Sequence, residues 1–283
     1  MRESQMLTIK INKEILKELG FSLEGPVNIP DTIRYQNKEY LVTKIERNGF
    51  RGCRKMTSVS IPAAVTEIES GAFYRCSKLA KIEFRDKESN QLRVIGERAI
   101  CYTRLTEITL PDKVHFLGRY ALADNTFLLH INLPHSLSII EAFAFSNCAN
   151  VEEIEIPDSV ASLGTHMFDG DEGLISVKLS CNMHTLEEGT FLDCWNLTEL
   201  ILPEGLKKIN LKAFDGCANI KHISLPSTIE VIQGQNWLWQ SCQQYFSYNG
   251  TKEEWRDMWA MYNYHQLPLH QTIRCLDGNI RNI

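Results

Sequence analysis

The stretch IEAFAFSNCANVEEIEIPDSV, residues 140–160, recurs with variations along most of the 283-residue chain. Its first residue has an Ile or Leu counterpart about every 23 residues: Ile45, Ile68, Ile95, Leu117, Ile140, Leu163, Leu186, Ile209 and Ile232. The spacing departs from this value at two steps. It is 27 residues from Ile68 to Ile95, where the polar insertion RDKESNQL falls, and 22 residues from Ile95 to Leu117. Such a repeat has to be interpreted first, because it decides the fold.

Each repeat carries its apolar residues at fixed distances from this Ile or Leu, which is counted here as position 0. Position 5 is large and apolar throughout: Phe50, Phe73, Ile100, Leu122, Phe145, Phe168, Phe191, Phe214 and Trp237. Apolar residues also recur at positions 11, 14, 16 and 20, and most repeats have proline at position 17. The alternation around positions 13 to 16 predicts a half-buried strand. The proline predicts the end of that strand, because it has no N–H to donate.

One such unit cannot bury its own apolar side, whereas stacked units bury a continuous core. We expect the strands of successive repeats to lie side by side, about 4.8 Å apart, in a parallel sheet. A second short extended piece should run from position 20 into the next repeat, and the side chain at position 5 should point inward. Since the alternation is clear, one face of the sheet should be open to solvent.

Units such as IESGAFYRCSKLAKIEF, residues 68–84, resemble the BspA-like leucine-rich repeat family. The resemblance covers roughly residues 27–245 and continues into YNGTKEEWRDM, where Thr251 and Glu254 predict a capping box at the start of a helix. It implies a leucine-rich-repeat solenoid, mainly β, built as a right-handed curved stack of parallel strands. The implied division is an N-terminal cap with a partial repeat and a hairpin (1–44), eight to nine repeats (45–245), and a C-terminal helix and strand cap (246–283).

Members of this family are often bacterial surface or secreted proteins that bind other proteins. The resemblance therefore implies a non-enzymatic adhesion or scaffold module whose partner is a protein, such as one on a host or bacterial surface. The exposed sheet face is the usual binding surface of a solenoid. Its residues at positions 13 and 15 form a set that we call the strip: Ser58, Lys81, Glu83, Glu107, Thr109, His130, Asn132, Glu153, Glu155, Ser176, Lys178, Glu199, Ile201, His222 and Ser224.

The strip is polar, leans acidic from Glu107 to Glu199, and lacks the aromatic and arginine anchors typical of tight interfaces. A basic or a weak, multivalent partner fits it better than a tight apolar one. A merely solvated sheet face is the competing interpretation.

Aromatic residues near the C-terminus form a rival surface: Trp237, Trp239, Tyr245, Phe246, Tyr248, Trp255 and Trp259. Trp255, Met258, Trp259 and Tyr262 share one face of the expected helix, so packing of the cap onto the last repeat is the simpler interpretation. The alternative is an exposed patch used for carbohydrate binding, for catalysis or for self-association.

Five of the nine cysteines occupy position 8 of their repeats: Cys53, Cys76, Cys148, Cys194 and Cys217. We expect a buried, reduced column, because free cysteine behaves as a small buried hydrophobe. Oxidation of the neighbouring pairs Cys53–Cys76 or Cys194–Cys217 is the alternative. The sequence has no Cys-x-x-Cys, so it does not predict a zinc site. For Cys101, Cys181, Cys242 and Cys275, which lie outside the column, we expect no catalytic role.

No motif for an enzyme or a cofactor is recognisable in the sequence, and we expect neither. His130 and His222 occupy equivalent strand positions four repeats apart, or roughly 20 Å, so they cannot share a metal ion. The carboxylates Glu152, Glu153 and Glu155 lie on a regular strand, which indicates a solvated face rather than an acid–base pair.

Charge and hydropathy narrow the list of partners. The net charge is −5, so the chain lacks the basic balance expected of a nucleic-acid-binding protein. No run of 18 apolar residues predicts a transmembrane segment. The N-terminus has no apolar core of a signal peptide. The expected compartment is the cytoplasm if Met1 is the native start, and the cell surface or the medium by family resemblance.

Overall fold

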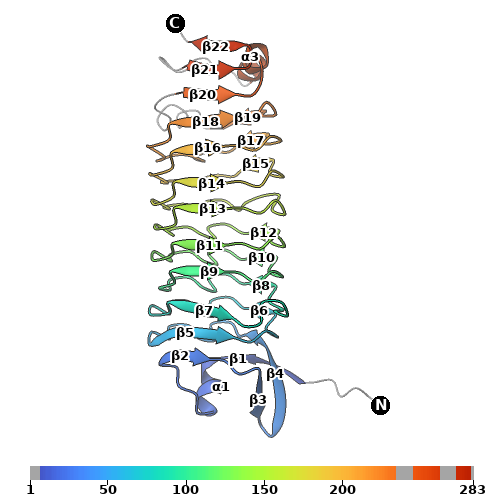
Figure 1. The fold of residues 1–283 in the computed structure, drawn as a ribbon, viewed down its shortest axis with the longest axis vertical. Coiled ribbons are helices and arrows are strands. Elements are labelled where there is room, and N and C mark those ends of the chain that lie inside the picture. The colour runs from blue at the N-terminus through green and yellow to red at the C-terminus, as the bar shows by residue number, and fades with distance from the viewer. Residues whose placement is uncertain (1–6, 234–244, 262–271, 282–283) are drawn as a thin grey trace, which may run out of the picture. The chain divides into compact units, whose positions relative to one another are not determined.

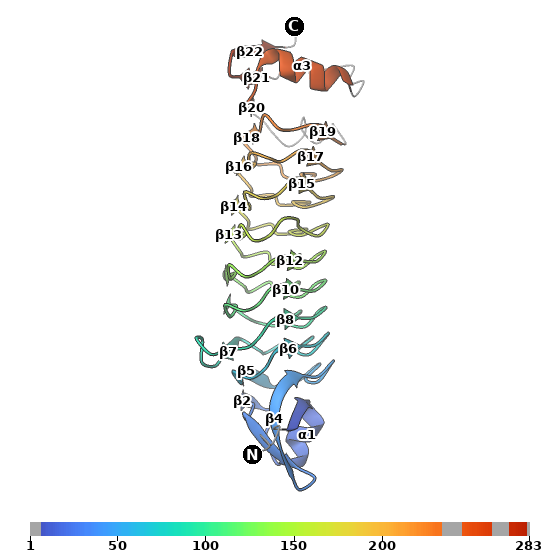
Figure 2. The ribbon, with the colours of Figure 1, turned by 90° about the vertical axis from the view of Figure 1, so that its right-hand side faces the viewer.

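The structure, a computed structural model, describes residues 7–233, 245–261 and 272–281. The chain forms two compact units, Met1–Phe145 and Ser146–Ile283. Within each unit the longer strands, one per repeat, form one row, and the two-residue strands form a second row (Figures 1 and 2). The predicted solenoid of parallel strands is thereby confirmed. No helix in the described ranges is long and apolar enough to cross a membrane.

The first unit opens with a cap of mixed structure and continues with the repeats. Its elements are β1 (Leu7–Ile11), α1 (Lys13–Glu18), β2 (Gly25–Asn28), β3 (Thr32–Tyr35), β4 (Lys38–Ile45), β5 (Met56–Ile61), β6 (Glu67–Ile68), β7 (Lys81–Phe84), β8 (Val94–Ile95), β9 (Glu107–Thr109), β10 (Phe116–Leu117), β11 (His130–Asn132) and β12 (Ile139–Ile140). The longer strands form the sheets β2-β5-β7 and β9-β11, and the short ones continue the row β1-β4-β6-β8-β10-β12.

The cap begins the stack by imitating a repeat. In β2, Val27 pairs with Val59, which is at position 14 of the first full repeat, so β2 is the strand of a partial repeat. β3 and β4 form an antiparallel hairpin whose turn residues, Gln36 and Asn37, are both left-handed, the geometry of a tight two-residue turn. Asn12 caps α1, because its side chain accepts a hydrogen bond from the N–H of Ile15 at 2.9 Å.

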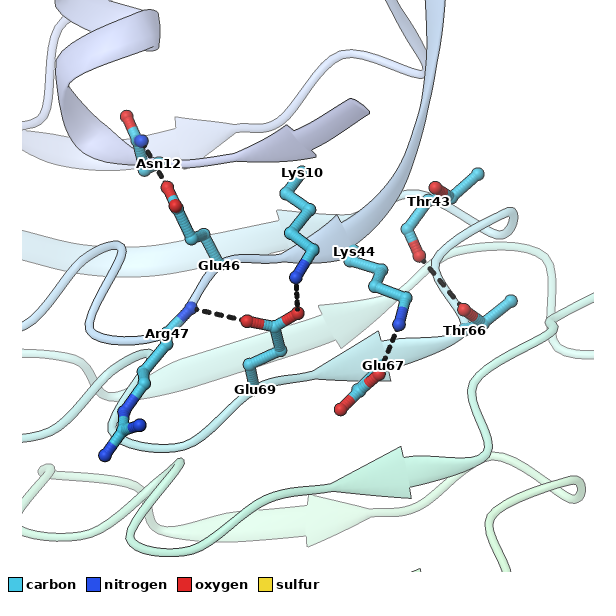
Figure 3. A network of polar contacts seen from close by, with 9 residues as sticks. All are labelled: Lys10, Asn12, Thr43, Lys44, Glu46, Arg47, Thr66, Glu67 and Glu69. Carbon is cyan, nitrogen blue, oxygen red and sulfur yellow. Dashed lines mark hydrogen bonds and ion pairs between the residues drawn. The ribbon is translucent and has the colours of Figure 1, made fainter. Parts of the chain in front are cut away.

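A polar network ties β1 to the first repeats (Figure 3). Glu69 accepts from the ammonium of Lys10 at 2.5 Å and from the backbone N–H of Arg47 at 3.0 Å. Burial alone would raise the pKa of Glu69, but these hydrogen bonds lower it overall. Lys44 and Glu67 form a second pair at 2.6 Å. These contacts join the cap to the first repeat.

The second unit continues the repeat and ends in a different cap. Its elements are β13 (Glu153–Glu155), β14 (Ser176–Lys178), β15 (Thr185–Leu186), β16 (Glu199–Ile201), β17 (Lys208–Ile209), β18 (His222–Leu225), β19 (Val231–Ile232), β20 (Tyr245–Tyr248), α3 (Lys252–Met261), β21 (Thr272–Cys275) and β22 (Gly278–Arg281). The longer strands form the sheets β13-β14 and β16-β18-β20-β21-β22, and the short strands form β15-β17-β19.

The predicted capping box starts α3. The Thr251 N–H donates to Glu254 at 2.7 Å, and the Glu254 N–H donates to the Thr251 hydroxyl at 3.2 Å. Trp255 is 2% exposed and its ring contacts Tyr248 at 5.2 Å between centroids. Met258 is also buried, which supports the predicted packing face for these two residues. The side chain of Trp259 and all of Tyr262 lie outside the described residues, as do Trp237 and Trp239.

The side chains at position 5 form the core of both units, as the repeat predicts. Phe50 and Phe73 are 0% exposed and stack at 5.4 Å. In the second unit Phe191 stacks on Phe168 at 5.5 Å and on Phe214 at 5.6 Å. The near-parallel rings recur once in each of these repeats, so each of them presents a similar surface to the next.

Two left-handed residues per repeat form the turns that surround position 5. They fall at position 3, as in Asn48 and Gly71, and at position 7, as in Gly52 and Arg75. At Gly71, φ is +67°, and an added Cβ would lie 2.4 Å from the side-chain oxygen of Asn48. Glycine at this position adopts the left-handed conformation without strain and leaves room for the Asn48 side chain.

The column at position 8 is buried except at Cys53, which is half-exposed, and it is more polar than the sequence indicated. All described cysteines are free thiols, and Cys76, Cys194 and Cys217 are 0% exposed. Each donates its thiol hydrogen to the carbonyl of position 5 in the preceding repeat, as Cys76 does to Phe50 at 3.1 Å and Cys217 to Phe191 at 2.9 Å. The column thus satisfies a buried backbone acceptor as well as filling space. Cys242 lies outside the described residues.

Candidate functional site

In the first unit the strip residues lie on two sheets, β2-β5-β7 and β9-β11, and on each sheet they share one face. Ser58 pairs laterally with Lys81, and His130 pairs with Glu107. Within a strand the exposed residues flank a buried one, as Glu107 and Thr109 flank Ile108. This alternation directs the strip side chains away from the core, as expected for half-buried strands. One polar contact links neighbouring strands here, from Asn132 to the Thr109 hydroxyl at 3.1 Å.

The face of the first unit is hollowed between β7 and β9, which belong to different sheets. The hollow has a volume of about 630 Å³. Four of the predicted strip residues line it: Lys81, Glu83, Glu107 and Thr109. Residues of the 85–92 insertion, among them Arg85, Asp86 and Lys87, complete the lining. The lining carries both charges, so the hollow is suited to a polar group of a partner rather than to an apolar one.

The insertion is anchored rather than loosely attached. Arg85 donates to Asp31 at 3.0 Å and to the Ile29 carbonyl at 2.6 Å, both in the N-terminal cap. Asn90 is 2% exposed, donates to the Arg85 carbonyl and accepts from the Leu92 N–H, each at 2.9 Å. The insertion can be recognised in the sequence, but its position beside the strip cannot. The signal was the extra length directly after a strip strand.

In the second unit the strip falls on β13, β14, β16 and β18. Glu153 pairs laterally with Ser176, and Glu155 pairs with Lys178, whose ammonium approaches the carboxylate to 2.5 Å. Ile201 is 74% exposed, an apolar side chain on an otherwise polar face. His222 is half-buried beside the Ser247 hydroxyl at 2.8 Å. Glu199 pairs laterally with His222, but its side chain lies outside the described part of the chain.

The structure places each predicted strip residue on a longer strand, and it assembles the strip separately in each unit. His130 and His222 belong to different units. Among the described residues no group of three or more His, Cys, Asp or Glu side chains could hold a metal ion. Glu152, Glu153 and Glu155 are all exposed, as a solvated strand face requires.

At the C-terminus the described rings of Tyr248 and Trp255 are buried, which agrees with packing of the cap, the simpler interpretation of the sequence. A hollow of about 450 Å³ is lined in part by Glu230, Tyr248, Glu254 and Asp257. The Glu254 carboxylate is occupied by the capping box, and the backbone hydrogen bond from Thr251 lowers its pKa. A general acid needs a raised pKa instead. Tyr248 is 3% exposed, so its ring packs in the cap and does not offer a stacking platform.

A protein-family model, the BspA type leucine rich repeat region, matches residues 31–129 and 120–245 in six copies. The matches cover well over half of the chain, so the protein belongs to the BspA-type leucine-rich repeat family. No match was found among curated proteins.

Solved structures of leucine-rich repeat proteins resemble the chain at low identity. PcpA, a pneumococcal vaccine antigen, is 18% identical, with 92% of this chain and 89% of that chain covered and a TM-score of 0.46. A leucine-rich repeat protein of T. pallidum is 21% identical, with 75% and 74% covered and a TM-score of 0.40. A leucine rich cell surface protein from Faecalibacterium prausnitzii A2-165 is 20% identical, with 82% and 90% covered and a TM-score of 0.36. These likenesses carry no functional information.

Proposed function

We propose that the protein is a non-enzymatic protein-binding module, an adhesin or scaffold, that presents the strip to a protein partner. The observation that carries the proposal is the lateral register of the strip strands, which sets exposed side chains in rows on a rigid core. Family membership supports the class, since stacked repeats form extended binding surfaces. The hollow between β7 and β9 gives this face a polar recess.

The chemistry of the strip indicates a polar, mainly electrostatic contact. Exposed carboxylates such as Glu107 and Glu153 favour basic groups on the partner. Lys178 already neutralises Glu155, so the acidic character is local rather than continuous. Such contacts contribute more to association rate and specificity than to affinity. A multivalent partner would gain strength from several weak contacts.

The test uses a photo-crosslinking amino acid placed at Thr109 and at Glu153, one strip position in each unit. Lys113 and Ala161 serve as matched control positions, because they are exposed but lie off the longer strands. We expect the same protein to be crosslinked from both strip positions and from neither control. Crosslinks from the control positions alone would contradict the proposal.

The affinity of that partner is then measured with charge reversals. The double variant Glu107→Lys with Glu153→Lys should weaken binding roughly tenfold, because charged groups of an interface contribute to the rate of association. Glu39→Lys with Glu172→Lys changes the net charge equally at exposed sites off the strip and should leave the affinity unchanged. Equal losses from both pairs would mean that only net charge matters and that the strip is not the binding face.

A further inference from the structure

Arginine is distributed unevenly along the chain. Nine of the fourteen arginines lie between residues 47 and 119, and none lies between residues 120 and 255. Most of the nine are on the turns around position 5 of the first repeats. These turns define a surface that we call the Arg–Tyr edge: Arg47, Arg51, Arg54, Tyr74, Arg75 and Tyr102. All four of its arginines are exposed.

Aromatic rings hold two of these guanidinium groups in place. Arg51 lies over the ring of Tyr74 at 5.0 Å. Arg75 lies over Tyr74 at 5.2 Å and over Tyr102 at 5.6 Å, and the two rings meet edge to face at 5.9 Å. A stacked guanidinium keeps its N–H groups at the edge of its plane, so they remain available to an acceptor. The stacking removes much of the entropy that a free arginine loses on binding.

The same arrangement continues in the next repeats. Arg98 lies over the Tyr120 ring at 4.5 Å. Arg119 lies over Tyr120 at 5.2 Å and over Phe143 at 5.4 Å. Repetition of the pattern along the stack makes the edge an extended surface rather than a single point of contact.

The positive charge of the edge is largely uncompensated. Among residues with described positions, no carboxylate forms an ion pair with Arg51, Arg54 or Arg75. These three arginines and Lys13 line a hollow of about 420 Å³. A second hollow, of about 400 Å³, is lined in part by Arg47, Arg51 and Arg98. Exposed cation–π contacts contribute only about 0.5–1 kcal/mol each, so stability alone does not explain this concentration of like charges.

We infer that the Arg–Tyr edge docks an acidic segment of a protein partner. Fixed guanidinium forks bind carboxylates with two parallel hydrogen bonds, and arginine with tyrosine is the combination enriched at the centres of protein interfaces. The inference rests on the proposed protein-binding function and assigns it a second surface, opposite in charge to the strip.

Carboxylates beside the edge favour a peptide over a uniform polyanion. Glu97 is paired with Arg98, and Asp124 accepts from the Cys101 thiol at 3.6 Å beside Tyr102. A nucleic acid or a sulfated glycan would bring negative charge against these groups. A peptide can place its carboxylates at Arg51 and Arg75 and its apolar side chains on the rings.

The test measures fluorescence anisotropy of a labelled peptide that repeats Glu-Phe-Glu-Ser, titrated with the full chain. We expect saturable binding that weakens with salt, because exposed charges are screened. Arg51→Glu with Arg75→Glu should weaken it at least about tenfold. Arg51→Lys with Arg75→Lys should give an intermediate loss, since lysine keeps the charge but not the fork.

Matched controls separate this surface from the others. The double variant Lys38→Glu with Lys212→Glu makes the same change in net charge at exposed sites off the edge. Its affinity for the peptide should stay within about twofold of the wild-type value, because distant charges are screened. The strip variant Glu107→Lys with Glu153→Lys should not weaken peptide binding. If only the strip variant lost peptide binding, the Arg–Tyr edge would not be the docking surface, whereas the proposed protein-binding function would still hold.

Two further results would overturn the inference. One is absence of peptide binding, or binding that is the same in the Arg→Glu variant. The other is tighter binding, dependent on the same arginines, of a heparin fragment or a single-stranded oligonucleotide of equal charge. That result would make the edge a surface for polyanions rather than for proteins.

Discussion

The turns of the two units occupy the same repeat positions but carry charges of opposite sign at several of them. Positions 6 and 7 hold Arg51 and Arg75 in the first unit, and Asp169 and Asp193 in the second. Beneath these turns position 5 stays large, apolar and buried. Stacked phenylalanines occur in both units, and Ile100 and Leu122 take their place in two repeats of the first. The comparison teaches that the buried half of the repeat maintains the fold, whereas the exposed half is free to specialise.

The largest expected effects on stability come from substitutions at the buried positions, which are similar in the two units. Phe73→Ala and Phe191→Ala should each lower the free energy of unfolding by about 3–5 kcal/mol, because each ring is fully buried. Urea unfolding of the two variants measures both losses. A loss below about 1 kcal/mol in one unit only would mean that the two cores are not equivalent.

The column at position 8 offers a finer comparison. Asn125 in the first unit and Asp171 in the second are both almost fully buried. Asn125 donates to the carbonyls of Ile100 and Leu122 at 2.8 and 2.7 Å. Asp171 accepts from the Cys148 N–H at 2.6 Å, and burial raises its pKa well above the usual range. Similar positions are thus filled by a neutral and by an ionisable side chain.

Exchanging these two residues should have effects of opposite sign. Asn125→Asp loses two donors and buries a carboxyl, so it should lower the free energy of unfolding by about 2–3 kcal/mol. Asp171→Asn should raise it by about 1–2 kcal/mol at mildly alkaline pH, because it removes a buried ionisable group but keeps an acceptor for Cys148.

The gain from Asp171→Asn should depend on pH. The folded pKa of Asp171 lies above the unfolded value of about 3.9, so the folded state holds the proton more tightly. Ionisation therefore destabilises the folded state fully above the raised folded pKa, and progressively less as the pH falls toward the unfolded value. Unfolding measured across that range should show the gain shrinking toward about pH 4. A gain that does not vary with pH would argue against a buried carboxyl.

The sequence could predict what repeats. The register of Phe73 in the core, the strand positions of Glu107 and Glu153, and the capping box at Thr251 all follow from spacing. The hollow beside β7 could not be foreseen, because it depends on how Arg85 anchors the insertion to Asp31. The Arg–Tyr edge depends on left-handed turns that bring Arg75 against two rings. The negative net charge of the whole chain gives no indication of this local group of arginines.

The central claim is that buried positions hold the fold while exposed turns bind, and urea unfolding of Arg51→Glu with Arg75→Glu tests it most directly. Exposed substitutions usually change stability by no more than about 0.5 kcal/mol each. The three lost cation–π contacts, at about 0.5 kcal/mol for each exposed pair, add roughly 1.5 kcal/mol. The predicted free energy of unfolding is therefore within roughly 2–3 kcal/mol of wild type. A loss as large as that of Phe73→Ala would show that these arginines hold the fold together, and would contradict the division between buried and exposed positions.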